Sequence, residues 1–573
     1  MVKEKNRKQS FMAGVFTIMI AQVLIKLLGF VYRHVLILIP EFGDEGSGLY
    51  GIGFNIYMLL LSIATVGIPG AISKLVSDRV ARNKVKEAKY IFKVALGLFS
   101  FIGLIGTLIM LCLASSMAKM AGNEAATGVL IALAPSVIFV AIASVIRGYF
   151  NGLYNMKPSS FNQTLEQIFK AGLTILFVYG IHFIYTNKVE LATTFGITQE
   201  TVTTIMAVWA NIASTISTAI GLLYLFIYYK LHKKDIDIIS KEAKDEVEKL
   251  SSIKHTIKVI LGLSIPMSLA SVVSAINRNI DSFTVNNILQ DVVPILKPSL
   301  VGNTKAIVDE ATRLYGILAG KVDMLIGLPL SINIAFATAL VPAVTESLAK
   351  GGKELAKKQI SYSIRLSLLI ALPCSIGLCI LAEPILELLF HGQVATSPES
   401  VLLLQISAFT VLFTVMNQTI NASLQGLGRI FIPALALLCG VIVKLIMNLI
   451  LIRIPEINIY GAAIGSVCCH FIATVIVSRI LTKNIKLDLP LRKLLTKPII
   501  AVLLMATITL LVKYGFGKLL GTSSRLLTII CLFVAVFVYA ISVIKLKILS
   551  EDDYKQLPAG DKLYNVLRKI KLV

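Results

Sequence analysis

The feature that most constrains this chain is the recurrence of apolar runs long enough to cross a lipid bilayer. A helix of about 20 apolar residues covers the ~30 Å hydrocarbon core. Runs of this length recur about fourteen times along the sequence. Hydrophobic residues make up 56% of the 573 residues and charged residues only 15%, whereas ordinary soluble domains are about a quarter charged. The sequence therefore predicts an all-α, polytopic membrane protein with about 14 transmembrane helices.

The expected spans are separated by short charged loops. They cover residues 11–39, 49–72, 90–117, 126–147, 160–185, 202–229, 259–289, 315–344, 362–390, 401–424, 431–452, 460–481, 498–512 and 526–544. A longer charged segment divides them into two groups. The predicted parts are an N-terminal six-helix lobe (1–229), a cytoplasmic connector (230–258), a C-terminal six-helix lobe (259–482), two additional transmembrane helices (483–547) and a cytoplasmic tail with an amphipathic helix (548–573).

The two six-helix groups resemble each other in sequence. In each, a glycine-containing break is followed by a proline, at Pro158 or Pro433, and then by a lysine about three turns deeper, at Lys170 or Lys444. The matching positions lie roughly 275 residues apart, which predicts two lobes related by a pseudo-two-fold axis along the membrane normal. The alternative is that membrane composition alone produces the likeness.

The net charge of +23 comes from Lys and Arg residues that are dispersed among short interhelical loops. They concentrate in one set of alternate loops, as the positive-inside rule requires of cytoplasmic segments. This distribution predicts that both termini are cytoplasmic, and it argues against a nucleic-acid partner. The basic N-terminus precedes an apolar run that is too long for a cleaved signal peptide, so the first span is expected to be retained.

Several spans contain charged residues. The span that includes residues 264–289 carries Arg278 and Asp281, and placing a charge there costs about 2.5–3.5 kcal/mol unless it faces a partner or a watery cavity. The two side chains are three residues apart, so they could simply neutralise each other on one helix face. The sharper hypothesis is that they line a transport cavity. Once the charges near span ends are set aside, the charges within expected spans are Lys26, Arg33, Glu166, Lys170, Arg278, Asp281, Lys321, Asp323 and Lys444.

This set is predominantly positive, which favours an anionic ligand. Guanidinium and ammonium groups bind phosphate oxygens through charge-assisted hydrogen bonds. The expected substrate site is a central cationic cleft. Its predicted members are Lys26, Arg33, Lys170, Arg278, Lys321 and Lys444, with Asp281, Asp323 and Glu166 as coupling groups or charge partners.

A structural role remains open for each of these groups. Glu166 and Lys170 are four residues apart and would form an ion pair on one helix face. Arg33 could extend to the headgroups instead of a cleft. Lys321 and Asp323 are two residues apart on a helix, so they would point in different directions.

Enzymatic motifs are missing from the sequence. It has no phosphate-binding glycine loop followed by Lys and Ser or Thr, no His/Glu metal motif and no nucleophile elbow. We therefore expect a transporter rather than an enzyme, with no catalytic residues, no metal and no cofactor. A coupling ion, Na⁺ or H⁺, would be the exception.

Five segments carry a resemblance to a known family: KLLGFVYR, VGIPGAISKLVSD, RGYFNGLYNMKP, NQTLEQIFKAG and LQGLGRIFIP. They resemble the polysaccharide-transporter branch of the multidrug/oligosaccharidyl-lipid/polysaccharide exporter superfamily, and within it the group of stage V sporulation protein B and the Gram-positive lipid II flippases. The resemblance extends over nearly the whole chain.

The resemblance implies a V-shaped pair of lobes that works by alternating access. Such proteins move lipid-linked oligosaccharides, often on undecaprenyl diphosphate, to the outer leaflet, and two extra C-terminal helices form a groove for the lipid tail. Basic residues of the first and eighth helices hold the diphosphate-sugar, so Arg33 and Lys321 are the implied counterparts. One departure is that the expected second span, 49–72, has no basic residue, which favours another lipid-linked glycan over lipid II.

The sequence therefore predicts a flippase of the bacterial plasma membrane for an undecaprenyl-diphosphate-linked oligosaccharide or peptidoglycan precursor of the cell wall or spore cortex. Its expected partners are this lipid-linked glycan, membrane lipids and cell-wall synthesis enzymes. One alternative is a cation-coupled multidrug antiporter of the same superfamily, which would favour a cleft rich in carboxylates. A second is a non-transporting membrane scaffold for cell-wall synthesis.

Overall fold

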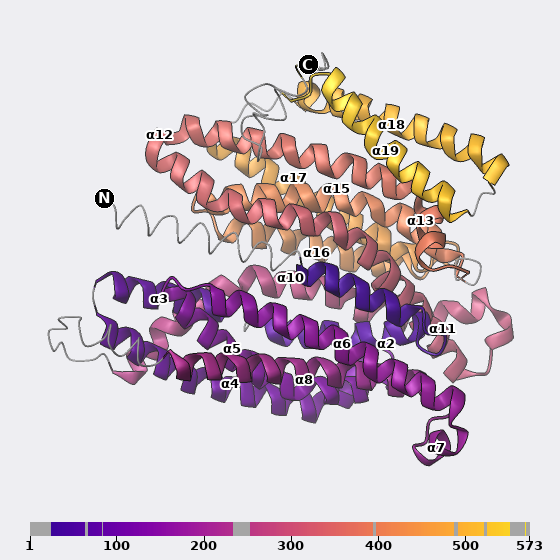
Figure 1. Cartoon of the computed structure of the whole chain (residues 1–573), viewed down its shortest axis with the longest axis horizontal. Coiled ribbons are helices and arrows are strands. Elements are labelled where there is room, and N and C mark those ends of the chain that lie inside the picture. The colour runs from indigo at the N-terminus through magenta and orange to yellow at the C-terminus, as the bar shows by residue number, and fades with distance from the viewer. Residues whose placement is uncertain are drawn as a thin grey trace. The chain divides into compact units, whose positions relative to one another are not determined.

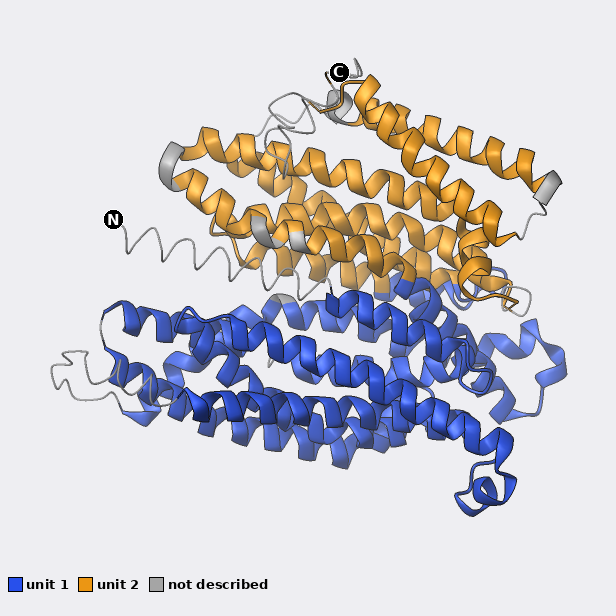
Figure 2. Ribbon diagram, in the orientation of Figure 1, with its two compact units in different colours: residues 1–324, 445–459 blue, residues 325–444, 460–573 orange. Residues whose placement is uncertain are grey.

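A computed structural model of the chain describes residues 24–62, 67–82, 84–232, 252–392, 397–485, 491–520, 524–549 and 568. Every regular element among these residues is a helix, and none is a strand (Figure 1). The chain forms two compact units, coloured separately in Figure 2. Unit 1 comprises residues 1–324 and 445–459, and unit 2 comprises residues 325–444 and 460–573.

Unit 1 contains a helix that includes residues 24–37 and a series of further helices. These are α2 (Gly43–Ser62), α3 (Ile68–Ala81), α4 (Val85–Met120), α5 (Ala126–Gly152), α6 (Lys157–Asn187), α7 (Val189–Thr194), α8 (Val202–Leu231), α10 (Ile253–Leu296), the short η2 (Pro298–Leu300), α11 (Thr304–Gly316) and the π-helix η3 (Ile317–Val322). Local chemistry sets several starts. Pro158 lies in the first turn of α6, and the side chain of Ser252 caps α10 by accepting a hydrogen bond from the backbone N–H of His255.

Helix α5 lies at the centre of unit 1, where it packs against α2, α3, α4 and α8. Helix α10 packs against α2, α3 and α4, and α11 packs against α2. The approach of α11 to α2 is close enough to require glycine: a Cβ atom on Gly316 would lie 1.7 Å from the backbone oxygen of Asp44. On the facing helix, a Cβ on Gly48 would lie 2.2 Å from the backbone oxygen of Thr312. These two glycines let the helix backbones touch.

Unit 2 is built around long helices with an apolar core. Its helices are α13 (Ala382–Leu389), α15 (Glu399–Gly426), α17 (Tyr460–Ile485), α18 (Leu491–Leu520), α19 (Arg525–Lys545), most of α16 (Phe431–Leu451) and α12 (Asp323–Ile380) except its first two residues, which belong to unit 1. Helix α12 consists of two helices joined across a kink at Gly352, whose φ of 64° is a conformation that glycine adopts without strain. Buried Val344, Leu368, Leu424 and Val477 belong to the core between α12, α15 and α17.

Eleven helices among the described residues are long and apolar enough to cross a membrane, or twelve if α10, bent by 47° near residue 270, counts as one span. This confirms the predicted class, an all-helical membrane protein with many spans. The count of about fourteen helices and the division into six-helix lobes stay predictions. The amphipathic tail helix, most of the connector and the start of the first span lie outside the described residues.

One expected span is divided in the structure. The run over 362–390 is interrupted at Leu381, where φ and ψ are −104° and 16° and α13 begins a new helix. The run over 49–72 includes the end of α2 and the start of α3, and residues 63–66 between them lie outside the described residues. Hydropathy reports how apolar a segment is, but it does not report where the backbone leaves the helical conformation.

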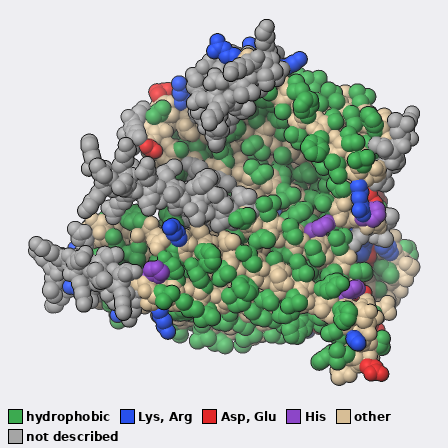
Figure 3. Space-filling model, viewed as in Figure 1, with side chains coloured by type: hydrophobic (Ala, Val, Ile, Leu, Met, Phe, Trp, Pro, Cys, Tyr) green, Lys and Arg blue, Asp and Glu red, His purple; other side chains and the backbone are tan. Residues whose placement is uncertain are grey.

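The surface agrees with a lipid environment. Hydrophobic side chains dominate the face shown in Figure 3, with few Lys, Arg, Asp and Glu residues between them. On α4, Phe101, Leu104 and Leu108 are largely exposed. A contiguous apolar surface of this kind is unstable in water and is expected where a helix faces acyl chains.

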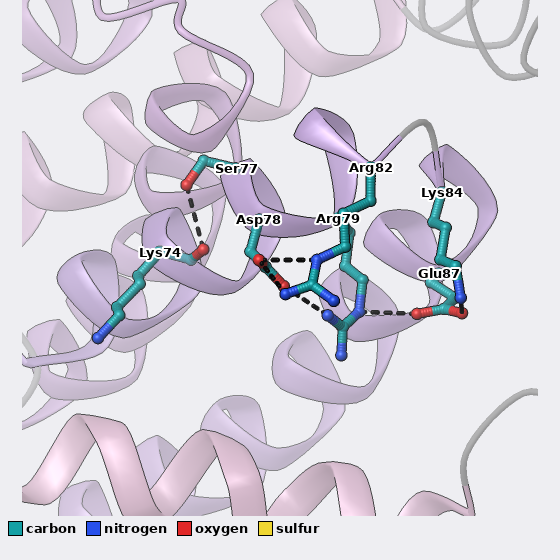
Figure 4. A network of polar contacts seen from close by, with 7 residues as sticks. All are labelled: Lys74, Ser77, Asp78, Arg79, Arg82, Lys84 and Glu87. Atoms are coloured by element: carbon teal, nitrogen blue, oxygen red, sulfur yellow. Dashed lines mark hydrogen bonds and ion pairs between the residues drawn. The ribbon is translucent and has the colours of Figure 1, made fainter.

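Several ion pairs connect the end of α3 with the start of α4 (Figure 4). Arg79 contacts Asp78 and also Glu87, whose Oε2 lies 2.7 Å from its Nε atom. Arg82 reaches the same Asp78. Arg79 and Glu87 border a small pocket with Tyr90 on α4 and His255 on α10. Because its charges already neutralise each other, we assign this pocket a structural role.

We predict that Gly316→Ala destabilises the protein, because the added methyl group would collide with the backbone of α2 and not with a flexible side chain. Overpacking of this kind costs about 1–3 kcal/mol. A fall in the melting temperature of the detergent-solubilised protein measures the effect. The matched control is Gly172→Ala on α6, where a Cβ would have nothing within 4 Å. Equal melting temperatures for the two variants would contradict the close approach.

Candidate functional site

The first cation of the site is Arg33, which lies on the helix that includes residues 24–37. Its guanidinium carbon lies 5.8 Å from the centroid of the Tyr50 ring and 5.9 Å from that of Phe54, both on α2. Tyr50 and Phe54 are four residues apart, and their rings stack at a centroid distance of 5.7 Å. The hydroxyl of Tyr50 lies 3.2 Å from that of Tyr32, the residue before Arg33.

The second cation, Lys170 on α6, uses the same aromatic rings. Its Nζ atom lies 4.2 Å from the centroid of Phe54, 5.8 Å from that of Tyr50 and 5.9 Å from that of Tyr32. A cation within about 6 Å of a ring face gains about 0.5–2 kcal/mol, depending on how far it is removed from water. The rings therefore hold two like charges close together without neutralising either.

Lys26 and Arg278 extend this group of charges. Lys26 lies seven residues before Arg33, which is two helical turns along the same face. Its ammonium group is close enough to Arg33 and to Arg278 of α10 for both charges to act on it. We call Lys26, Arg33, Lys170 and Arg278 the cationic cluster. Arg33 and Lys170 are partly buried, while Lys26 and Arg278 are exposed.

Two carboxylates act on the cationic cluster. Asp323, at the start of α12, acts on Arg33 and Arg278, and Glu166 of α6 acts on Lys170. Four cations thus face two carboxylates. The excess positive charge, in a region of low dielectric constant, makes this part of unit 1 suited to an anion.

Two further predicted site residues have contacts of their own. Asp281, one turn beyond Arg278, accepts a hydrogen bond of 3.0 Å from Asn448 of α16, whose amide also donates to Thr284. Lys444 belongs to unit 2, where it is buried and acts on His470 of α17. The membership of both residues in the substrate site stays a prediction.

Lys321 is fully buried, which differs from the expected position in an open cleft. Its Nζ lies 2.9 Å from Oδ2 of Asp44, and the two side chains are 2% and 9% exposed. The cause is local: Lys321 lies in the π-helix η3, next to the glycine contact between α11 and α2, so its side chain reaches the first turn of α2. This arrangement is an internal ion pair.

A polar contact set joins α2 to α10 and α11. The Asn55 amide donates to the Ser282 hydroxyl at 3.1 Å and to the Tyr315 hydroxyl at 2.9 Å, and the latter two lie 2.7 Å apart. Asn279 donates to the backbone oxygen of Asn55 at 2.8 Å. These contacts fix α10, which carries Arg278, against the helix that carries Tyr50 and Phe54.

Sequence reasoning missed several of these residues. The aromatic residues of α2 gave one signal, since Tyr50 and Phe54 share a helix face in a span without charges. Arg147 is a second residue that the sequence analysis did not single out, because it lies at the end of the expected fourth span. In the structure, α5 continues to Gly152, and Arg147 is only 8% exposed. It lies near Glu166, which is electrostatically its partner.

Comparison with known proteins places these observations in a family. The family of polysaccharide biosynthesis proteins matches residues 11–348, more than half of the chain, and the chain belongs to that family. A second family, MatE, matches residues 317–450.

Individual relatives are more distant. The chain is 28% identical over 491 residues to the stage V sporulation protein B of Bacillus subtilis, covering 84% of this chain and 86% of that protein. It is 25% identical over 486 residues to the lipid II flippase MurJ of the same organism, covering 82% of each. A solved structure of a lipid II flippase MurJ in an inward closed conformation matches 92% of this chain and 97% of its own, with a TM-score of 0.63 and 16% identity. This last likeness concerns the fold.

We predict that Asp44→Asn strongly destabilises the protein, because it leaves the ammonium group of Lys321 buried beside a neutral partner. Breaking one side of a buried ion pair costs about 3–5 kcal/mol, whereas replacing both sides with apolar groups is often nearly neutral. Thermal unfolding followed by size-exclusion chromatography should show a large loss for Asp44→Asn and substantial recovery in Asp44→Leu/Lys321→Met.

The matched control is Glu200→Gln, which breaks an exposed ion pair with Lys305. We expect little change there, since exposed pairs contribute about 0–1 kcal/mol. An unfolding temperature for Asp44→Asn equal to that of Glu200→Gln would rule out a structural role for the buried pair.

Proposed function

We propose that this protein is a flippase that moves a lipid-linked glycan with an anionic diphosphate headgroup across the membrane by alternating access. The observation that carries the proposal is the cationic cluster, in which Arg33 and Lys170 share the rings of Tyr50 and Phe54. Membership of the polysaccharide biosynthesis family supports it independently.

The chemistry of the cluster suits a diphosphate. A guanidinium group donates two parallel hydrogen bonds to phosphate oxygens, while an ammonium group acts as a compact point charge. Arg33 would orient the headgroup and Lys170 would neutralise it. Because aromatic rings hold the cations in place without quenching their charges, an incoming anion finds them already positioned.

The family and the relatives point to transport and not to catalysis. Bacillus subtilis MurJ is named a lipid II flippase, and the stage V sporulation protein B is named for sporulation. We infer for this chain an undecaprenyl-diphosphate-linked oligosaccharide or peptidoglycan precursor of the cell wall or spore cortex. The substrate would pass from the inner to the outer leaflet of a bacterial plasma membrane. The orientation with both termini in the cytoplasm is part of the same proposal, as are the two six-helix lobes and partnership with cell-wall synthesis enzymes.

A second candidate is a cation-coupled multidrug antiporter, which the MatE match to residues 317–450 favours. Its cargo would be cationic. The cationic cluster opposes such a cargo, because four positive groups outnumber the carboxylates Asp323 and Glu166 that act on them. We therefore rank the flippase first.

We predict that Arg33→Ala/Arg278→Ala lowers flipping of a fluorescent lipid-linked diphosphate in reconstituted vesicles by at least about tenfold. Loss of one charge-assisted hydrogen bond costs about 1.5–3 kcal/mol, and each 1.4 kcal/mol corresponds to a factor of ten. The assay measures the fraction of headgroups that a membrane-impermeant reagent can reach. The control variant Arg82→Ala/Lys188→Ala removes two exposed cations outside the cluster and should flip normally.

Two results would count against the proposal. Unchanged flipping by Arg33→Ala/Arg278→Ala would remove the cationic cluster from the substrate path. Efflux of a cationic dye by the wild-type protein, without any flipping of the lipid, would favour the antiporter.

A further inference from the structure

A second polar group lies next to the cationic cluster on α6. Glu166 precedes Lys170 by four residues, so the two side chains share a helix face and their charges act on each other. Both are partly buried, so they remain accessible from the surface of unit 1. Lys170 is held by the Phe54 ring at 4.2 Å. The carboxylate therefore has one neighbour that belongs to the proposed headgroup site.

Its other charged neighbour lies deeper. Arg147 of α5 is 8% exposed and donates from Nη2 to the hydroxyl of Ser144 at 3.0 Å, while its Nε atom is buried without a hydrogen-bond partner. Asn162, one turn before Glu166, is fully buried, and both polar atoms of its side chain lack a hydrogen-bond partner. Buried polar groups are normally paired. Arg147 and Asn162 therefore have unused hydrogen-bonding capacity close to an acidic group.

The other walls are neutral. Helix α8 presents Gly221, where a Cβ atom would lie 2.8 Å from Nδ2 of Asn162 and 3.5 Å from Oε2 of Glu166. Helix α2 presents the buried phenol of Tyr57, which lies close enough for the charge of Glu166 to act on it. The charged and titratable groups that face Glu166 are therefore Lys170 from its own helix, Arg147 from α5 and Tyr57 from α2.

We propose that Glu166 is the proton-coupling group of this protein: it takes up one proton when an anionic headgroup engages Lys170 and releases it when the headgroup leaves. This inference rests on the proposed function. Without substrate, the charged neighbours of Glu166 are two cations, Lys170 and Arg147. A bound diphosphate neutralises Lys170 and places negative charge about one helical turn away, so the carboxylate becomes a like-charge neighbour.

Protonation removes that repulsion. The step is an acid–base reaction in which the carboxylate accepts a proton from water when the headgroup binds and returns it to water when the headgroup leaves. The protonated carboxyl group gains an O–H donor, which Asn162 can accept with its unpartnered oxygen. A metal cation such as Na⁺ is a poor alternative to the proton at Glu166, because the fixed positive charge of Arg147 near the carboxylate repels it.

The test measures proton uptake on binding of farnesyl diphosphate, a short isoprenyl diphosphate, to the full-length protein in nanodiscs. Calorimetry in two buffers with different ionisation enthalpies gives the number of protons per bound ligand. We expect uptake approaching one proton for the wild type and for Glu166→Asp, and none for Glu166→Gln. The dissociation constant of the wild type should fall by up to about tenfold for each pH unit of acidification, as linkage requires for one proton.

Glu190→Gln is the control, since it removes an exposed carboxylate on α7 that is not among the residues around Glu166. It should retain wild-type proton uptake. Size-exclusion chromatography and the melting temperature show whether Glu166→Gln is folded, and Glu166→Asp tests the same carboxylate chemistry with minimal change.

The outcomes separate the two proposals. Tight binding with no proton uptake, or equal uptake in Glu166→Gln, would overturn the role of Glu166 and leave the flippase intact. Absence of farnesyl diphosphate binding in the wild type would refute the headgroup site and, with it, this inference. An infrared carboxyl band that titrates in the wild type and is missing from Glu166→Gln would support the assignment without any ligand.

Discussion

The structure of unit 1 depends on how positive charge is kept stable away from water. It uses two solutions that lie on the same helix. Near the start of α2, Asp44 pairs directly with Lys321, and the result is a closed, internally neutral contact. Two to three turns further, Tyr50 and Phe54 hold Arg33 and Lys170 by their ring faces, and the charges remain available. The pair of opposite charges is neutral and stabilises the fold, whereas the cations on the aromatic rings keep their charge and can bind an anionic ligand.

Helix α2 therefore takes part in almost every feature described for unit 1. It supplies Asp44 to the internal ion pair, Tyr50 and Phe54 to the cationic cluster, Asn55 to the polar contacts with α10 and α11, and Tyr57 to the surroundings of Glu166. Yet α2 contains no basic residue, so the pattern of charges in the sequence does not predict its role in the cationic cluster. Its contribution is to arrange cations that other helices carry.

Much of the class could be predicted from the sequence, because helices in a membrane must be long, apolar and internally hydrogen-bonded. The positions of Arg33, Lys170 and Arg278 within spans also drew attention to side chains that lie near one another in unit 1. What periodicity does not contain is the identity of the opposing helix. The residues around Lys321 in the sequence do not distinguish a cleft position from a buried one. Lys321 is buried because the chain approaches α2 closely at Gly316.

The same limit applies to helix ends. The expected fourth span ends at Arg147, but the polar and aromatic residues after it continue α5 as far as Gly152. The divided run at residues 362–390 is a further case. There, the hydropathy of the segment is unchanged by a break in the backbone, so only coordinates reveal it.

The π-helix at Ile317–Val322 determines the rotational position of the residues that follow it about the helix axis. A π-turn accommodates one more residue than an α-turn, and each residue of an α-helix advances by about 100°. Were that additional residue absent, Asp323 would be rotated by about a quarter of a circle or more relative to Arg33 and Arg278, on which it now acts. A single π-turn thus sets the direction in which the Asp323 carboxylate projects from its helix. An insertion or deletion in this turn would change the electrostatic effect of Asp323 on Arg33 and Arg278 without replacing any residue of the cationic cluster.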